Sequence, residues 1–240
     1  MRRGDRGRII RALGETCTSI FSRAEARAYD RHCMDALGIS GIVLMQNAAE
    51  GCAAIARRMC EGRDGGVIVV CGSGQNGGDG YGVAALLARD PGAAVRPVRV
   101  LALGQPKPGT DASVMCHEAR AAGVPIEPWR KDAIAEGTAL IVDALFGTGL
   151  DREMTGDALA AVEWINAQRA PVLSIDLPSG MDCDTGAGRP ACVHATVTAT
   201  MVAPKRGFAA APPCTGRVEV VRIGGPDPAC LHGGGQSPAR

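Results

Sequence analysis

After Gly65-Gly66, short apolar runs alternate with segments of helical character, and this alternation constrains the fold more than any other feature. Strands that are apolar at successive positions are buried on both faces, which is typical of parallel sheets covered by helices on each side. The sequence predicts strands at 67–71, 95–102, 139–143, 172–175, 193–200 and 218–223, and helices at about 79–90, 111–122 and 156–169. The predicted fold class is α/β, a three-layer α/β/α sandwich with a mostly parallel central sheet.

Two further helices are expected before the first strand. Ser22 and Glu25 match a capping box, which predicts a helix that ends near Leu37. The stretch "SGIVLMQNAAEGCAAIARRMC" has apolar residues at helical spacing and predicts a second helix. We therefore expect one domain over residues 21–225, a flexible N-terminal extension over 1–20 and a flexible Gly/Pro-rich tail over 226–240.

Composition excludes several classes of partner. The chain of 240 residues has a net charge of +1, which gives no reason to expect nucleic acid or an anionic membrane. The Arg-rich start lacks the apolar core of a signal peptide, and no apolar run approaches the ~18 residues of a membrane span. The ten cysteines form no C-x-x-C pair, which argues against a zinc ribbon and favours free thiols. These features predict a cytoplasmic protein.

Three predicted strands end in loops rich in glycine and short polar side chains. The loops are "CGSGQNGGDG" at 71–80, "VDALFGTGLDRE" at 142–153 and "SIDLPSGMD" at 174–182. One such loop is often only a tight connection. Because ligands of open parallel sheets bind outside the carboxyl ends of the strands, we expect the three loops to meet around one site.

The first loop resembles a dinucleotide fingerprint, since Gly72, Gly74 and Gly77 have the G-x-G-x-x-G spacing. That fingerprint expects an acidic residue about 20 positions later, and the stretch 95–104 contains no Asp or Glu. Asp79 is expected at the start of the helix, where it would cap the free N–H groups and occupy the place of a phosphate. No Gly-Lys-Ser/Thr follows, so a P-loop is excluded. A nucleotide bound in the manner of an ordinary dehydrogenase is disfavoured.

Oxygen-bearing side chains in the three loops indicate a cation. Asn76 offers an amide oxygen, Asp143 a carboxylate and Ser179 a hydroxyl. Ca²⁺ and Mg²⁺ usually collect more carboxylates, so this set with one formal charge better suits a monovalent ion such as K⁺. Asp176 remains as a candidate acid/base, or else as a structural cap of the turn at 178–180.

Together these stretches resemble the NAD(P)H-hydrate epimerase family, also called the YjeF N-terminal domain, which has a Rossmann-like fold. The matching segments are "LMQNAAEG", "VCGSGQNGGDGYGVAALLA", "VDALFGTGLDREMTG", "SIDLPSGMDCDTG" and "VAPKRGF", and the resemblance covers roughly residues 22–225. The family interconverts the R and S epimers at C6 of NAD(P)HX, the hydrated and damaged form of NAD(P)H. A dehydratase specific for one epimer then regenerates the cofactor.

The resemblance implies site residues and partners for this chain. It implies one K⁺ per subunit held by Asn76, Asp143 and Ser179. It implies NADHX or NADPHX as substrate, a homodimer, and a dehydratase on another chain as functional partner. The substrate contacts that it implies are Gln75, Asn76, Gly77, Gly78, Asp79, Gly147, Thr148, Gly149, Leu150, Asp151, Arg152, Glu153 and Asp176.

Epimerisation at C6 requires a general acid to help the hydroxyl leave and a base to help water return to the opposite face. Our hypothesis assigns this proton transfer to Asp176. Lys205 in "APKRG" is a second candidate, as a proton donor or a phosphate partner, and an exposed loop lysine is the alternative.

Two positions depart from the family pattern, because Gln75 stands where Asn is common and Gln46 where Glu is common. The rival interpretation is a non-catalytic nucleotide-binding or protein-interaction module of the same fold. Loss of Asn76, Asp143 or Asp176 would favour that rival, and all three are present.

Overall fold

The computed structural model describes residues 19–90, 96–188, 190–210 and 213–228. Most of the predicted extension and tail therefore lies outside the described residues. At the boundary of the extension, Ser19 is buried. The N–H of Phe21 donates to the carbonyl of Pro204, and the carbonyl of Phe21 accepts from the N–H of Arg206, both at 2.8 Å. The chain is therefore packed on the domain from this boundary onward, and the flexibility of residues 1–20 stays a prediction.

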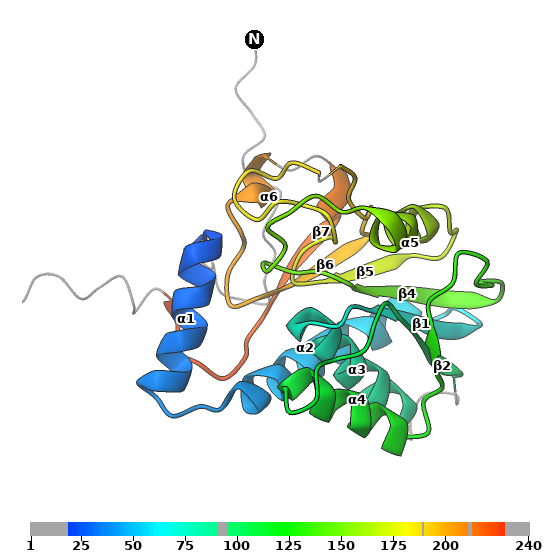
Figure 1. Ribbon diagram of the computed structural model, residues 1–240, viewed down its shortest axis with the longest axis horizontal. Helices are drawn as coiled ribbons and strands as arrows, with labels where there is room; N and C mark the ends of the chain where they lie inside the picture. Colours follow the sequence, from blue (N-terminus) through cyan, green and yellow to red (C-terminus); the bar gives the residue numbers. More distant parts are fainter. Residues whose placement is uncertain (1–18, 91–95, 189, 211–212, 229–240) are drawn as a thin grey trace, which may run out of the picture.

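All strands of the described residues form one sheet of seven, in the order β3-β2-β1-β4-β5-β6-β7 (Figure 1). Every pairing is parallel, so the expected α/β class with a mostly parallel sheet is confirmed. The strands are β1 (Gly66–Cys71), β2 (Val98–Ala102), β3 (Ile126–Pro128), β4 (Thr138–Ala144), β5 (Val172–Ile175), β6 (Val197–Met201) and β7 (Arg217–Val221).

The sequence pattern missed β3 and extended β6 too far. β3 has only three residues, ends in a proline and lies at the edge of the sheet, so it contains no apolar run. Residues 193–196 precede β6 rather than belong to it, because the N–H groups of Val193 and Ala195 donate to residues outside the sheet. Val193 donates to Ser179 at 2.9 Å, and Ala195 donates to Cys214 at 2.8 Å. Val95, predicted to start the second strand, lies outside the described residues.

Helices cover both faces of the sheet. The helices are α1 (Arg23–Asp35), α2 (Gly41–Cys60), α3 (Gln75–Ala88), α4 (Asp111–Ala121), α5 (Gly156–Asn166), α6 (Gly207–Ala210) and the 3₁₀ turn η1 (Pro213–Thr215). The predicted capping box of α1 is present between Ser22 and Glu25. α2, α3 and α4 lie on one face of the sheet and α5 on the other (Figure 1). Among the described residues, no helix has the length and apolar character needed to cross a membrane.

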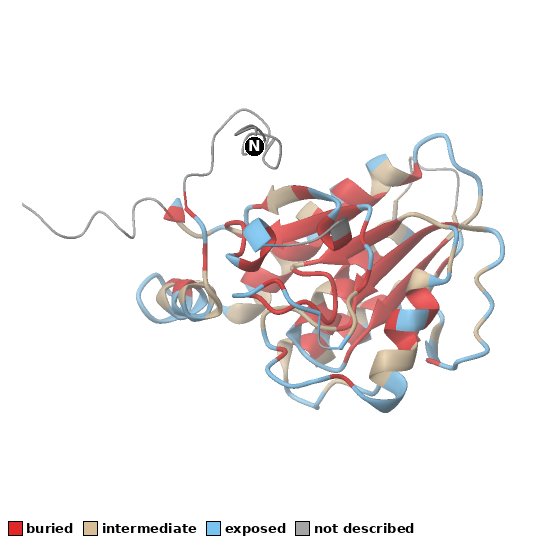
Figure 2. Cartoon of the chain, turned by 90° about the horizontal axis from the view of Figure 1, so that it is seen from above, coloured by how far each residue is buried: buried red, intermediate tan, exposed pale blue. Residues whose placement is uncertain are grey.

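Alternation along the central strands divides the core into two layers. Val67 and Val69 of β1 pack in one cluster with α2, α3 and α4. Ile68 and Val70 pack in a second cluster with α5 and Trp129. Figure 2 shows the sheet buried between these layers. Because successive strand residues point to opposite faces, the continuous apolar runs seen in the sequence fill both clusters.

The order of the strands places the carboxyl ends of β1, β4 and β5 next to one another. The chain leaves β1 toward β2 and β3 on one side, and returns to β4 on the other, so the topology reverses between β1 and β4. Cys71 pairs with Ala144, and Asp143 pairs with Ser174, so the three strands end at nearly the same level. This edge is where open α/β sheets bind ligands.

Candidate functional site

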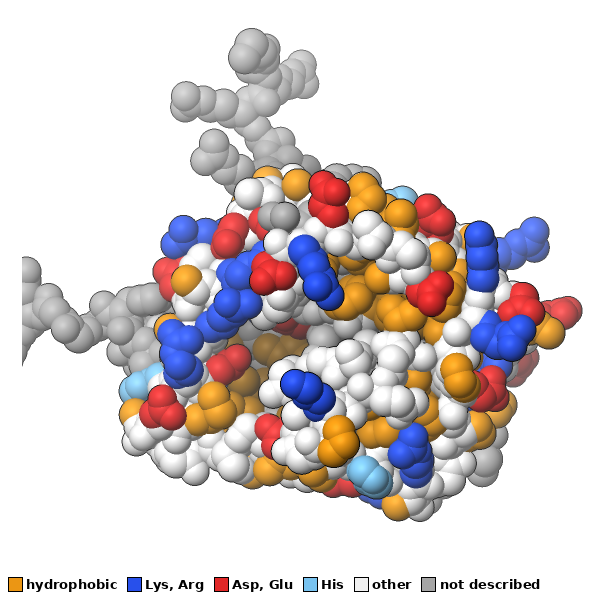
Figure 3. All heavy atoms as spheres, in the orientation of Figure 1, with side chains coloured by type: hydrophobic (Ala, Val, Ile, Leu, Met, Phe, Trp, Pro, Cys, Tyr) orange, Lys and Arg blue, Asp and Glu red, His pale blue; other side chains and the backbone are white. Residues whose placement is uncertain are grey.

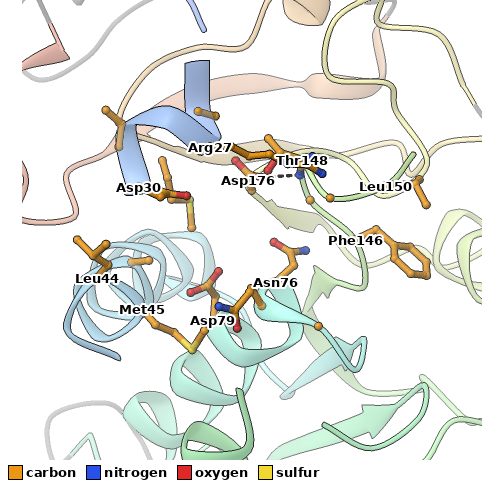
Figure 4. Close-up of a pocket in the computed structure, with 18 of the residues that line it drawn as sticks. Arg27, Asp30, Leu44, Met45, Asn76, Asp79, Phe146, Thr148, Leu150 and Asp176 are labelled. Atoms are coloured by element: carbon orange, nitrogen blue, oxygen red, sulfur yellow. Dashed lines mark hydrogen bonds between the residues drawn. The ribbon is translucent and has the colours of Figure 1, made fainter. Parts of the chain in front are cut away.

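A pocket of about 570 Å³ opens at the carboxyl ends of the strands. Residues from the loops after β1, β4 and β5 line it together with α1 and α2 (Figure 4). The space-filling view in Figure 3 shows this hollow on the same face. The prediction that the three glycine-rich loops meet in space is therefore confirmed.

The loop after β1 is shorter than predicted, because α3 begins at Gln75 rather than at Asp79. Its N-cap is Gly74, with no side-chain cap and no acidic residue in the first turn. Gly77 is helical and packs directly against the carbonyl of Gly72, where any side chain would collide. The expected capping role of Asp79 is thus wrong, since Asp79 lies in the second turn. The free N–H groups at the start of α3 remain open to an anion.

Asp176 follows β5 directly and has an unusual backbone. Its φ is 66°, in the left-handed region that residues other than glycine rarely adopt. The N–H of Leu177 donates to the carbonyl of Ile175 at 2.8 Å, which makes a three-residue γ-turn centred on Asp176. Such strain is typical of functional sites, where surrounding contacts hold a side chain in one direction. Here the turn directs the carboxylate into the pocket (Figure 4).

The next strand ends in the same way. Val202, after β6, has φ 68°, and the N–H of Ala203 donates to the carbonyl of Met201 at 2.7 Å. A positive φ is a genuine outlier for a β-branched residue. Both strained turns border the pocket.

Lys205 links the two turns. Its side chain is only 2% exposed, so the alternative of an exposed loop lysine is wrong. The ammonium donates to Thr200 Oγ1 at 2.8 Å, to the Met201 carbonyl at 3.0 Å and to the Ala203 carbonyl at 3.1 Å. It also pairs with Asp176 Oδ1 at 3.1 Å. With its donors satisfied by the protein, Lys205 is placed to position Asp176.

The loop after β4 supplies the second contact to Asp176. The N–H of Thr148 donates to Asp176 Oδ2 at 2.9 Å. A Cβ on Gly147 would lie 2.5 Å from Asp176 Oδ2 and 3.1 Å from Asn76 Oδ1. Gly147 is therefore the point where the three loops converge, and only glycine leaves room there for both polar groups.

Asp143 lies fully buried behind this layer, outside the lining of the pocket. Its Oδ1 accepts from Ser179 Oγ at 2.6 Å, and its Oδ2 accepts from Ser174 Oγ at 2.8 Å and from the Ser179 N–H at 2.9 Å. Burial raises the pKa of Asp143, and these hydrogen bonds work against that rise. Asp143 thus ties the end of β4 to the turn after β5.

Among the described residues that line the pocket, Asn76 has a buried polar atom that the protein leaves unsatisfied. Its Nδ2 is buried without a hydrogen-bond partner among the described residues. Nitrogen and oxygen of an amide exchange places on a half-turn, so an amide oxygen can face the same space. A cation there would remove the cost of the unpaired group. Of the three predicted ligands, Asp143 and Ser179 are hydrogen-bonded to each other, and Asn76 lies beside Gly147.

Among the carboxyl groups that line the pocket, Asp30 projects from α1, Asp79 from α3 and Asp176 from the turn after β5 (Figure 4). Asp30 is exposed at the mouth, and Asp79 is half-buried. Desolvation, and after it the nearby Asp176 and Asp30 carboxyls, raise the pKa of Asp79 well above its usual value. The pocket therefore favours a neutral Asp79 beside an ion-paired Asp176.

Most of the substrate contacts implied by the sequence line this pocket: Gln75, Asn76, Asp79, Gly147, Thr148, Gly149, Leu150, Asp151, Arg152 and Asp176. Gly77, Gly78 and Glu153 do not line it, and their predicted contacts stay predictions.

Sequence reasoning missed the contribution of α1 to the pocket. Arg27 and Asp30 lie one turn apart on that helix and both reach the cavity (Figure 4). Their i, i+3 spacing places them on one helix face, which was the available signal.

The family described as "YjeF-related protein N-terminus" matches residues 41–207.

Curated relatives fall into two groups of different length. An NAD(P)H-hydrate epimerase of Rhodopirellula baltica is 35% identical over 83% of this chain and 82% of its own length. An NAD(P)H-hydrate epimerase of Oenococcus oeni is 34% identical over 80% of this chain and 89% of its own. A bifunctional NAD(P)H-hydrate repair enzyme of Salinibacter ruber is 36% identical over 88% of this chain, but the match spans only 41% of that longer protein.

Among solved structures, the crystal structure of yeast YNL200c matches with a TM-score of 0.70. It covers 85% of this chain and 87% of the yeast chain, at 22% identity. At that identity the likeness concerns the fold alone.

Proposed function

The chain belongs to the family of YjeF-related protein N-termini, and from that premise we propose that it is an NAD(P)H-hydrate epimerase, an isomerase. The observation that carries the proposal is the match over most of their length to relatives that bear this name. The reaction would interconvert the R and S epimers at C6 of NAD(P)HX. The rival of a non-catalytic module gains no support, since Asn76, Asp143 and Asp176 are all present and hydrogen-bonded or buried at one site.

The pocket suits such a substrate in size and charge. Its volume of about 570 Å³ lies within the ~300–1,000 Å³ of small-molecule sites. The uncapped start of α3 offers N–H groups to a phosphate, and Arg27 and Arg152 stand exposed at the rim. We propose that the phosphates lie at this rim and that the hydrated nicotinamide ring enters between α3 and the turn at Asp176.

Asp176 is our candidate for proton transfer at C6. Thr148 and Lys205 fix its two oxygens, so the carboxylate is held in one orientation toward the cavity. The Lys205 ammonium, 3.1 Å from Asp176 Oδ1, keeps the carboxyl group facing the cavity, where it can exchange a proton with a bound ligand. Lys205 has no donor to spare for a phosphate, so we assign it the positioning of Asp176.

A K⁺ ion held by Asn76, Asp143 and Ser179 is part of this proposal, with one ion per subunit. The unpaired amide of Asn76 and the single carboxylate of this set fit a monovalent cation. When bound, K⁺ would supply positive charge that orders the loops after β1, β4 and β5.

Partners follow from the two groups of relatives. The bifunctional enzymes of Salinibacter ruber and Pyrobaculum aerophilum are 36% and 37% identical to this chain, which spans 41% and 38% of their length. We propose that the epimerase acts together with an NAD(P)HX dehydratase. We further propose that it is a homodimer in the cytoplasm. Both NADHX and NADPHX remain candidate substrates.

A coupled assay tests the function. A mixture of both NADHX epimers is treated with an epimer-specific dehydratase until the reactive epimer is gone, and the protein is then added. If the protein is an epimerase, the absorbance at 340 nm should rise again as NADH forms, until the second epimer is consumed. An unchanged rate relative to the control without the protein would refute the function.

A further inference from the structure

The proposed reaction has a requirement that one carboxyl group cannot meet. Interconversion of two epimers through loss and return of a hydroxyl needs a proton donor on one face of the ring and a proton acceptor on the other. Asp176 reaches the ring from one wall of the pocket only, because Thr148 and Lys205 hold both of its oxygens there. A second proton-transfer group should therefore lie on the facing wall.

Asp79 lies on that wall. It projects from the second turn of α3 into the cavity, opposite the turn that contains Asp176, with Asn76 between them (Figure 4). Within the part of the chain that the structure describes, no hydrogen bond or ion pair engages the Asp79 carboxyl. Asp176, in contrast, is fixed by two partners. Asp79 is thus free to donate or accept a proton from a ligand in the pocket.

The surroundings of Asp79 favour its neutral form. The carboxyls of Asp176 and Asp30 act on it from two other walls of the pocket. The thiols of Cys52 on α2 and Cys71 on β1 lie behind it and are themselves buried, and burial raises the pKa of both thiols. The charges that raise the pKa of Asp79 are therefore those of the Asp176 and Asp30 carboxyls, whereas the two buried thiols are neutral. A carboxyl group that burial keeps neutral, on the wall facing the carboxyl group paired with Lys205, places a proton donor opposite a proton acceptor.

We propose that Asp79 is the second proton-transfer residue of the epimerase, serving the face of the nicotinamide ring opposite Asp176. This inference rests on the proposed function. It adds a catalytic role to a residue for which the sequence implied only a binding contact.

The reaction balances with these two residues. Protonated Asp79 gives its proton to the C6 hydroxyl, the C6–O bond breaks with its electron pair to release water, and the ring nitrogen lone pair forms a C=N⁺ bond. Water adds to C6 from the other face, the C=N⁺ pair returns to nitrogen, and the Asp176 carboxylate takes the proton of the added water. The reverse direction exchanges the two roles. Before the next turnover in the same direction, Asp176 releases its proton to water and Asp79 takes up a proton from water.

Oxygen exchange at C6 separates the two faces. Each purified NADHX epimer is incubated in H₂¹⁸O with wild type, Asp79→Asn or Asp176→Asn, and ¹⁸O incorporation is measured by mass spectrometry beside epimer formation by chromatography. The wild type is expected to exchange both epimers and interconvert them. In Asp79→Asn, interconversion should fall by about 100-fold or more, while one epimer still exchanges its oxygen through Asp176. In Asp176→Asn, only the other epimer should exchange.

The pattern of exchange decides the proposal. Asp79 has no role on a separate face if Asp79→Asn still catalyses ¹⁸O exchange in both epimers or in neither. The same holds if this variant interconverts the epimers at the wild-type rate. Asp64→Asn, at an exposed site away from the pocket, is the matched control and should equal the wild type. If Asp79→Asn fails to fold, Asp176→Asn decides alone, since it must catalyse ¹⁸O exchange in one epimer and not in the other. A wild type without interconversion would refute the proposed function, whereas an active wild type with the wrong variant pattern refutes only this inference.

Discussion

Lys205→Met is expected to weaken both the fold and the activity, because the ammonium fills a buried junction. Its three hydrogen bonds to Thr200, Met201 and Ala203 measure 2.8–3.1 Å, and its ion pair with Asp176 measures 3.1 Å. Removing one partner of a buried pair costs about 3–5 kcal/mol. For a domain of this size each kcal/mol lowers Tm by about 2–4 °C, so we expect Tm to fall by roughly 6–20 °C.

The activity of Lys205→Met reports on positioning. Without the ammonium, Asp176 keeps only its bond to Thr148, and a displacement near 1 Å costs about 100-fold in rate. We expect kcat for epimer interconversion to fall by about this factor, with KM nearly unchanged. Urea unfolding and steady-state kinetics measure the two effects. Lys131→Met, at an exposed site, is the control and should stay within about 0.5 kcal/mol. A free energy of unfolding within ~1 kcal/mol of the wild-type value, or full activity, would refute the positioning role.

Three other predictions concern the pocket. Gly147→Ala places a Cβ 2.5 Å from Asp176 Oδ2 and should reduce kcat by about 100-fold while the protein stays folded by circular dichroism; wild-type kinetics would contradict the close packing. Asp79→Asn should stabilise the fold at high pH. The pKa of Asp79 is raised in the fold, so its penalty is absent below about pH 4 and grows as pH rises through the folded pKa. Urea unfolding at pH 4 and pH 8 tests this difference, and a gain that is equal at both pH values would speak against a neutral Asp79. Replacing K⁺ by a bulky organic cation should lower the activity of the wild type. Asn76→Ala should remove that dependence, and an unchanged dependence would place the ion elsewhere.

The fold class could be predicted from the sequence because strands that are buried on both faces appear as continuous apolar runs. The apolar runs at 67–71, 139–143 and 172–175 became β1, β4 and β5 with shifts of at most a residue. β3 left no such pattern, because a three-residue edge strand buries little. Periodicity thus located the strands that build the core and missed the one that does not.

The meeting of the three loops was also predictable, since parallel strands end at one edge of the sheet. The burial of Lys205 was not. Its place depends on two strained turns, at Asp176 and Val202, and neither residue type signals a positive φ. The start of α3 was misplaced because glycines at 77 and 78 resemble a loop. In the structure they allow close packing of the helix on Gly72 and Met45.

The central claim is that the pocket interconverts the C6 epimers of NAD(P)HX with Asp176 as a proton-transfer group. The most direct measurement starts from one purified NADHX epimer and follows both epimers over time by chromatography. We predict that the wild type produces the second epimer until the two reach equilibrium, and that Asp176→Asn does so more slowly by about 100-fold or more. Formation of the second epimer at the rate seen without protein, or at the same rate with both proteins, would contradict the account.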